Sequence, residues 1–142
     1  MNKLEQFIGE HKEGFLATIE NGEPRIRPFQ IQFVVDEKFY LCTANTKEVY
    51  KQVQQHPFVE FSVSAPGNVF VRIRGKVKFD NNLILKQRII NENDLVRSIY
   101  KSGDHPSFEI FYIETGEGII AALDGRAPEF YKINESTEEA TI

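Results

Sequence analysis

The feature that most constrains the fold is the stretch Pro24–Pro57, in which an alternating segment leads into an aromatic segment and then a helical one. In the alternating segment Ile26 lies between two arginines, whereas from residue 29 to 35 the apolar residues hold the odd positions. A strand with a period of two residues changes face only through a bulge or kink. Pro28 stands at this change and has no N–H group for a ladder. We therefore predict that regular pairing is interrupted at residues 27–29.

The second half of this stretch predicts a short strand followed by a helix. Lys38–Thr43 is rich in aromatic and β-forming residues. Asn45 or Thr46 is expected to cap a helix that stops at a following His-Pro pair. Lys47 then falls in the first turn, where free N–H groups favour an anion. A solvated lysine explains Lys47 taken alone, but together with Arg27 on the neighbouring strand it indicates a phosphate site.

The rest of the chain indicates further strands and peripheral helices. Asn21-Gly22 and Asp124-Gly125 are turn signals. Asn81 or Asn82 is expected to cap a helical segment that a polar run at residues 91–94 interrupts. The other predicted elements are a helix over 2–12 and strands over 14–20, 58–64, 69–79, 107–114, 118–123 and 129–133. This pattern is typical of a mainly β, mostly antiparallel barrel of six to seven strands with helices outside.

Composition limits the classes of function. We expect one domain over residues 1–133 and a frayed acidic tail over 134–142. The net charge of −4 offers no basic field for nucleic acid, and no apolar run reaches the length of a membrane span. The single cysteine, Cys42, excludes an internal disulfide and favours the cytoplasm. The three histidines have no metal-ligand spacing, so no metal is expected.

The motifs RPFQ at Arg27–Gln30 and YLCTANTKEVYKQVQQHP at Tyr40–Pro57 resemble the pyridoxamine 5'-phosphate oxidase-like family of FMN-binding split barrels. PFVEFSV at Pro57–Val63 and VRIRGKV at Val71–Val77 continue the resemblance in the same order. The short length and the RPF and TKxV spellings are more similar to the small flavoproteins grouped with nitroimidazole-resistance proteins. The resemblance implies a split barrel that forms a homodimer with FMN at the interface.

The resemblance also assigns residues to the cofactor. Arg27 matches the arginine that holds the FMN phosphate, and the next three residues match the backbone run along the isoalloxazine. Cys42 stands where the oxidases have an aromatic residue. The strand that carries Phe70 lies near the subunit interface in this family. The residues expected to contact FMN are Arg27, Pro28, Phe29, Gln30, Cys42, Thr43, Asn45, Thr46, Lys47, Phe70, Arg72 and Arg74.

Three departures weaken the case for vitamin-phosphate oxidation in particular. The paired Arg-Lys of true oxidases is Glu48-Val49 here, their strand lysine is Gln32, and their strand glutamine falls near Phe70. No catalytic acid or base stands out, so a bound flavin would carry the chemistry. A dimer would also bury surplus aromatic residues; the candidates are Phe29, Phe58, Phe70, Phe108, Phe111 and Tyr112.

Three functions remain open, in order of preference. The first is a dimeric FMN-dependent oxidoreductase that takes electrons from a small-molecule donor and passes them to a small acceptor. The second is a non-catalytic flavin- or haem-binding protein for storage, sensing or protection, with His56 or His105 as candidate axial ligands. The third is a sheet-mediated interaction module without a cofactor, which leaves Arg27 and Lys47 unexplained. The step from fold to reaction rests on analogy.

Overall fold

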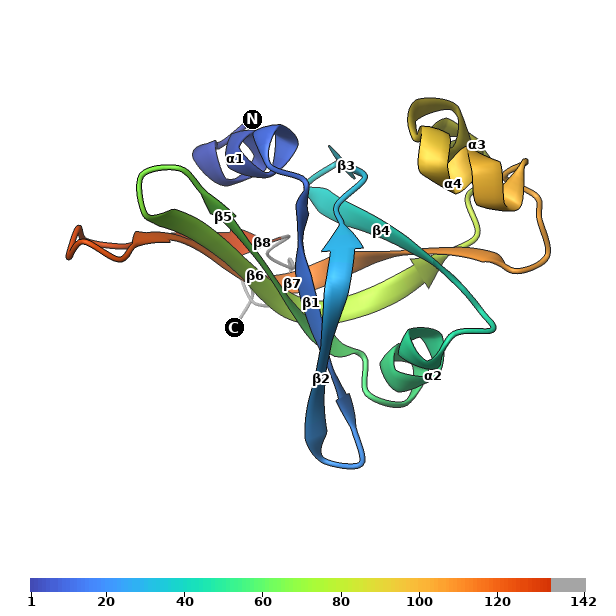
Figure 1. Cartoon of the computed structure of the whole chain (residues 1–142), viewed down its shortest axis with the longest axis horizontal. Helices are drawn as coiled ribbons and strands as arrows, with labels where there is room; N and C mark the ends of the chain where they lie inside the picture. The colour runs from blue at the N-terminus through green and yellow to red at the C-terminus, as the bar shows by residue number, and fades with distance from the viewer. Residues whose placement is uncertain (134–142) are drawn as a thin grey trace, which may run out of the picture.

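The computed structural model describes residues 1–133, which form four helices and eight strands (Figure 1). None of these helices is long and apolar enough to cross a membrane. The predicted tail over 134–142 lies outside the described residues. The elements are α1 Lys3–Glu10, β1 Glu13–Glu20, β2 Glu23–Gln30, β3 Phe33–Val35, β4 Lys38–Ala44, α2 Glu48–Gln55, β5 Phe58–Ala65, β6 Val69–Asp80, α3 Leu83–Glu92, α4 Asp94–Tyr100, β7 Phe108–Ala122 and β8 Glu129–Ile133.

All strand pairs are antiparallel and belong to one sheet in the order β2-β1-β5-β6-β7-β4-β3, with β8 paired to β7. The sheet is not closed by hydrogen bonds, because β2 and β3 stand at its two ends. These end strands are nevertheless consecutive in the chain and are joined by Ile31 and Gln32. The Ile31 N–H donates to the Lys12 carbonyl and the Gln32 N–H to the Tyr40 carbonyl, at 3.0 and 2.8 Å. The chain therefore changes strand partner at this point, and the barrel is split there.

The predicted interruption at residues 27–29 is wrong. β2 pairs with β1 in unbroken register from Glu13↔Gln30 to Glu20↔Glu23. Pro28 is tolerated because β2 is an edge strand, where one row of N–H groups needs no ladder partner. The alternation does not change phase either: Ile26 is 68% exposed on the outer face. The two arginines beside it share the inner face with Phe29.

The strand predictions over 107–114 and 118–123 are also corrected, because one continuous strand, β7, covers both. It forms the longest pairing of the sheet with β6, and a bulge lies between Lys76 and Val77. Next to this bulge Gly75 faces Gly116 across the two strands. A Cβ on Gly116 would lie 1.9 Å from the Arg74 carbonyl oxygen, so only glycine allows this approach. The gap between the two predicted strands therefore marks a close approach of β6 and β7 next to a bulge, and the strand does not end there.

The helix caps differ from the prediction at one helix. Asn82 accepts a hydrogen bond from the Leu85 N–H at 3.1 Å and so caps α3, as predicted. The predicted cap of α2 by Asn45 or Thr46 is wrong, because Lys47 is its N-cap residue and makes no side-chain cap bond. The Asn45 amide instead donates to the Pro106 carbonyl and to Glu109.

Two apolar clusters hold the fold together. The larger one fills the barrel and receives Leu4 and Ile8 from α1, while the second lies between β4, β7 and the α3–α4 pair. These clusters correct the prediction that surplus aromatic residues lie at a dimer interface. Phe108, Phe111 and Tyr112 are buried within the chain, and Phe29 packs against Phe111 at 6.1 Å between ring centroids. Phe58, in contrast, is 57% exposed on the sheet.

Candidate functional site

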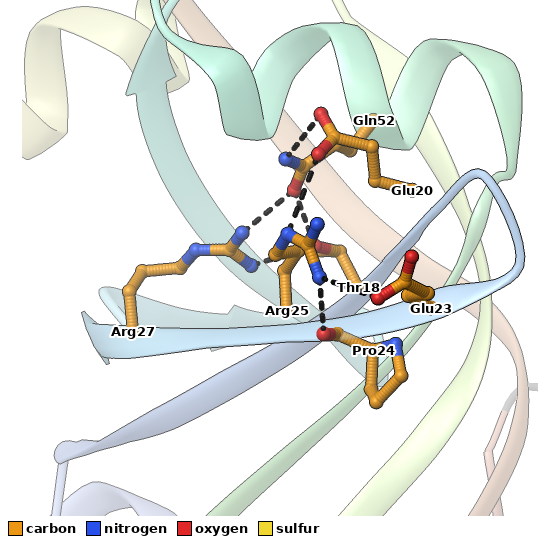
Figure 2. A network of polar contacts seen from close by, with 7 residues as sticks. All are labelled: Thr18, Glu20, Glu23, Pro24, Arg25, Arg27 and Gln52. Carbon is orange, nitrogen blue, oxygen red and sulfur yellow. Dashed lines mark hydrogen bonds and ion pairs between the residues drawn. The ribbon is translucent and has the colours of Figure 1, made fainter.

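A buried polar network joins the β1–β2 hairpin to α2 (Figure 2). Thr18 and Gln52 are 2% and 5% exposed, so their polar groups depend on partners inside the protein. The Thr18 hydroxyl donates to Gln52 Oε1 at 2.6 Å, and the Gln52 amide donates to Glu20 Oε2 at 3.2 Å. Arg27 reaches the same network from β2, donating to Gln52 Oε1 at 2.6 Å and to Thr18 Oγ1 at 2.7 Å.

The guanidinium of Arg27 is fixed by hydrogen bonds, but not all of its N–H donors take part in them. A third bond runs from its Nη1 to the Leu16 carbonyl at 3.2 Å. Of its five N–H donors, the one on Nε and one on Nη2 make no hydrogen bond within residues 1–133. Burial lowers the pKa of Arg27, Arg25 lowers it further, and Glu20 opposes the shift. Because arginine stays protonated in proteins, the group remains a cation.

The N-terminus of α2 has no side-chain cap. The Lys47 backbone is extended and its N–H bonds to the Ala44 carbonyl at 3.1 Å, while the Lys47 and Thr46 side chains are exposed. The free N–H groups of a first turn and the positive end of the helix dipole favour an anion. Gln52 lies five residues further along this helix, about 7.5 Å along its axis.

The structure separates two neighbours that were both expected to contact a cofactor. Thr43 lies on the barrel side of β4, is 4% exposed, and its hydroxyl has no partner among the described residues. Cys42 lies on the opposite side of β4 and packs against the α3–α4 cluster. Burial raises the pKa of its thiol to about 12, although Lys47 opposes the shift.

The four residues Arg27–Gln30 alternate between the faces of β2. Phe29 points inward with Arg27, whereas Pro28 is exposed on the outer face. Gln30 donates to Glu13 at 2.9 Å and accepts from the Asn93 amide at 3.1 Å. A ligand lying along this strand would therefore meet its outer face and backbone, while Arg27 reaches toward α2.

The structure does not bring the β6 residues to Arg27 within one chain. Phe70, Arg72 and Arg74 lie on the outer face of β6, whose inner face is the buried row Val71 and Ile73. Arg74 forms an ion pair with Glu117 on β7. The Arg72 guanidinium lies 5.8 Å from the centroid of the Phe70 ring.

Sequence reasoning missed Thr18, Gln52 and Glu109. A signal for Gln52 was present, since it interrupts the buried stripe of α2 between Val49 and Val53. Thr18 likewise occupies a buried position of β1. Glu109 left no such pattern; it lies directly opposite Thr43 on β7 and accepts from Asn45 at 3.0 Å.

The arrangement is suited to an anionic ligand. Among the described residues, Arg27 has two free donors, the α2 N-terminus beside Lys47 has no side-chain cap, and the buried Thr43 hydroxyl has no partner. Gln52 joins Arg27 to α2, and Thr43 lies on β4, the strand before this helix, so these groups can donate hydrogen bonds to a phosphate. Residues 1–133 contain no group of three His, Cys, Asp or Glu side chains that could hold a metal ion.

Several known proteins are similar to this chain. The structure of a NimC/NimA family protein from Clostridium acetobutylicum is 31% identical, with a TM-score of 0.81, over 89% of this chain and 87% of that one. General stress protein 26 of Bacillus subtilis is 27% identical over 118 residues, which are 79% of this chain and 81% of that protein.

Two solved structures share the fold at low identity. A pyridoxamine 5'-phosphate oxidase-related, FMN binding protein from Nostoc punctiforme has a TM-score of 0.62 and 15% identity over 87% of each chain. A heme binding protein from Mycobacterium smegmatis has a TM-score of 0.72 and 15% identity over 91% of this chain and 56% of that one.

A family model described as pyridoxamine 5'-phosphate oxidase matches residues 1–117. The match covers most of the chain, including the split in the sheet, the β1–β2 hairpin and all of α2. The chain belongs to the pyridoxamine 5'-phosphate oxidase family.

Proposed function

We propose that this protein is an FMN-binding flavoprotein and a small oxidoreductase that passes hydride or electrons to a small-molecule acceptor. The observation that carries the proposal is the Arg27 guanidinium, which is fixed by three internal bonds and keeps two donors for an anion. Family membership supports FMN as the source of that anion.

The chain's own residues would bind and orient the cofactor. Arg27, Lys47 and the first-turn N–H groups of α2 would hold the phosphate, and Thr43 would donate its hydroxyl. The backbone of Pro28–Gln30 would lie along the ring system. FMN supplies hydride or electron transfer when bound, and no side chain of the site is assigned the role of acid or base.

The proposal includes a homodimer formed through the outer face of the sheet. Large apolar side chains are exposed there, and two of them, Ile19 and Phe58, line an open groove of about 790 Å³. They come from four different strands and are Phe15, Ile19, Ile26, Phe58 and Phe130. Several large apolar side chains exposed on one face of a sheet indicate an interaction site, and charged groups such as Glu60 and Arg72 among them would set the register of two copies.

In such a dimer Phe70, Arg72 and Arg74 would approach the cofactor held mainly by the partner. We also propose a reducing compartment, the cytoplasm, because the only cysteine in the chain, Cys42, is free.

A second candidate is a non-catalytic flavin- or haem-binding protein, prompted by the fold shared with the heme binding protein. The contacts of the two candidate axial histidines favour flavin over haem. His105 packs on Tyr100 at 5.6 Å between ring centroids, and its Nδ1 accepts from the Ser107 N–H. His56 is the C-cap residue of α2. Both histidines therefore already have structural roles.

The first experiment is the visible absorption spectrum of the purified protein, followed by mass analysis of what heat releases. Flavin bands with released FMN are expected. A sharp Soret band would transfer the proposal to haem. A colourless protein that also takes up no added FMN would refute the proposal that the protein binds FMN.

The phosphate assignment is tested by Arg27→Ala and Lys47→Ala, with Lys51→Ala as the matched control. Lys51 is an exposed cation on α2 that pairs with Glu48 at 3.5 Å. Loss of a charge-assisted bond predicts about tenfold weaker FMN binding for each test variant and little change for the control. Equal affinity in all three variants would contradict the assignment.

Enzyme and carrier are separated by anaerobic reduction. Addition of NADH or NADPH should bleach the bound flavin, and a nitroaromatic or quinone acceptor should restore its absorbance. A flavin that neither nucleotide reduces, but dithionite does, would favour the carrier.

The dimer is tested by sedimentation of Phe15→Glu and Phe58→Glu. A charge in the middle of an apolar interface should shift the protein to monomers. A wild-type protein that sediments as a monomer at all concentrations would refute this part of the proposal.

A further inference from the structure

We propose that Gln52 is a positioning residue: a neutral anchor that orients the Arg27 guanidinium toward a phosphate without neutralising its charge. This inference rests on the proposed function, since it concerns the same phosphate. Gln52 is on α2, and the bonds that it makes join this helix to both strands of the β1–β2 hairpin (Figure 2).

The hydrogen-bond directions allow only one orientation of the Gln52 amide. Its Oε1 receives two donors, the Thr18 hydroxyl and Arg27 Nη2, both at 2.6 Å. The single Thr18 proton is therefore directed to Gln52, which leaves Thr18 Oγ1 to accept from Arg27 Nη1 at 2.7 Å. Gln52 Nε2 donates to the Glu20 carboxylate at 3.2 Å. A flipped amide would direct donors at a cation and an oxygen at a carboxylate.

The charges around Arg27 are arranged so that no carboxylate pairs with it. Within residues 1–133 Arg27 makes no salt bridge, although two glutamates flank the turn of its hairpin. Arg25 takes both, Glu20 at 3.3 Å and Glu23 at 3.8 Å. Glu20 is also bonded to the Gln52 amide. No carboxylate therefore pairs directly with Arg27, and its guanidinium remains available to a ligand.

A carboxylate at position 52 would change this balance. It would keep one acceptor oxygen for Thr18 and Arg27 and form a buried ion pair with Arg27. Its second oxygen would replace the amide donor and face the Glu20 carboxylate. An ion pair in a site of low dielectric screens the cation far more than a neutral amide does. Leucine, by contrast, has a similar volume but no acceptor, so both Thr18 and Arg27 would lose a partner inside the protein.

These two substitutions separate a positioning role from a merely structural one. For Gln52→Glu made together with Glu20→Gln, which removes the repulsion between the two carboxylates, we expect an apo-protein that melts at the wild-type temperature or above, with FMN bound about tenfold more weakly. For Gln52→Leu we expect melting temperature and affinity to fall together. A structural role alone predicts that affinity follows melting temperature in both variants, and wild-type affinity in a stable double variant would overturn the proposal.

The matched control is Glu20→Gln, which lies in the same network but removes a negative charge. Its FMN affinity should equal or exceed that of the wild type, opposite in direction to the double variant. An affinity that falls to the level of the double variant would overturn the proposal, because any disturbance of the network would then have the same effect.

A measurement without flavin separates this inference from the proposed function. Guanidinium NMR of the ¹⁵N-arginine-labelled apo-protein, assigned with Arg27→Lys, should show resolved Nη signals for Arg27 in the wild type and averaged signals in Gln52→Leu. Averaged signals in the wild type would overturn the positioning role. Resolved signals in a protein that binds no FMN would leave Arg27 held as described, but would refute the FMN function and the purpose proposed for Gln52.

Discussion

The helices on the two sides of the barrel are held in different ways. The α3–α4 pair covers an apolar cluster, and asparagine side chains cap both of its helices. α2 covers the barrel with Val49 and Val53, but it directs Gln52 into a polar network and has no side-chain cap. In Figure 1 the pair and α2 lie at separate positions around the sheet.

This difference distinguishes a structural element from one prepared for a ligand. In α3 and α4 one first-turn N–H of each helix finds an asparagine side chain as its partner, so a ligand would add little there. In α2 the first-turn N–H groups, the Lys47 side chain and two donors of Arg27 have no hydrogen-bond partner among residues 1–133. Unused donors lower the stability of the free protein and make binding of an anion more favourable. Four predictions test this difference between α2 and the α3–α4 pair.

The largest expected effect is on stability, in the α3–α4 cluster. Phe108 has no exposed surface and packs on Tyr100 at 4.6 Å between ring centroids. Phe108→Ala should cost about 3–5 kcal/mol of unfolding free energy in urea denaturation, from lost burial and a cavity. Phe58→Ala, at an exposed ring of the same type, should change it by about 0.5 kcal/mol or less in a monomeric sample. Equal losses would show that the cluster is not the stabilising region.

The second largest effect on stability is expected at the asparagine caps of α3 and α4. Asn93 accepts from the Val96 N–H at 3.1 Å, and its amide donates to Gln30 at 3.1 Å and Gln32 at 3.0 Å. Asn93→Ala removes a cap and two bonds and should cost about 2 kcal/mol. Asn82→Ala removes a cap alone and should cost about 1 kcal/mol, also by urea denaturation. If the two variants are equally stable, the bonds to the split in the barrel contribute nothing.

At α2, stability and binding should change in opposite directions. Lys47→Asp places a capping carboxylate at the N-cap and should raise the unfolding free energy by about 1 kcal/mol while weakening FMN binding. Asn82→Asp, which exchanges one good cap for another on α3, should leave both quantities nearly unchanged. Calorimetric melting measures the stability of each variant, and flavin titration measures its affinity for FMN. A Lys47→Asp protein that binds FMN normally would contradict an anion site at α2.

The smallest effect is the pH behaviour of Cys42. Burial raises the pKa of its thiol to about 12 in the folded protein, from the ordinary value of 9.0. Its contribution to stability is therefore present below pH 9.0 and is lost as the pH rises toward about 12, because the unfolded thiol ionises first. A thiol reagent at about pH 8 should react far more slowly with native than with urea-unfolded protein. Equal rates would place Cys42 outside the cluster.

Local signals in the sequence predicted the turns well. Asn21-Gly22 adopts positive φ at both residues, as a two-residue hairpin requires, and β1 and β2 pair on either side of it. The apolar alternation of β6 likewise gives its buried face. The same reasoning failed at Pro28, where an edge position removed the need for a bulge. It also failed at Gly116, where a close crossing of two strands resembles a break.

The sequence alone was enough to predict the order of most strands and helices, the buried face of β6 and the family, because periodicity and motif order are local properties of the chain. The tertiary structure was needed to show where the barrel splits, which side of β4 faces the barrel, and that Gln52 anchors Arg27. Those facts depend on which distant segments pack together: a hydrogen bond between residues 25 positions apart leaves no period in the sequence. A buried glutamine is recognised as an anchor only when its partners are known.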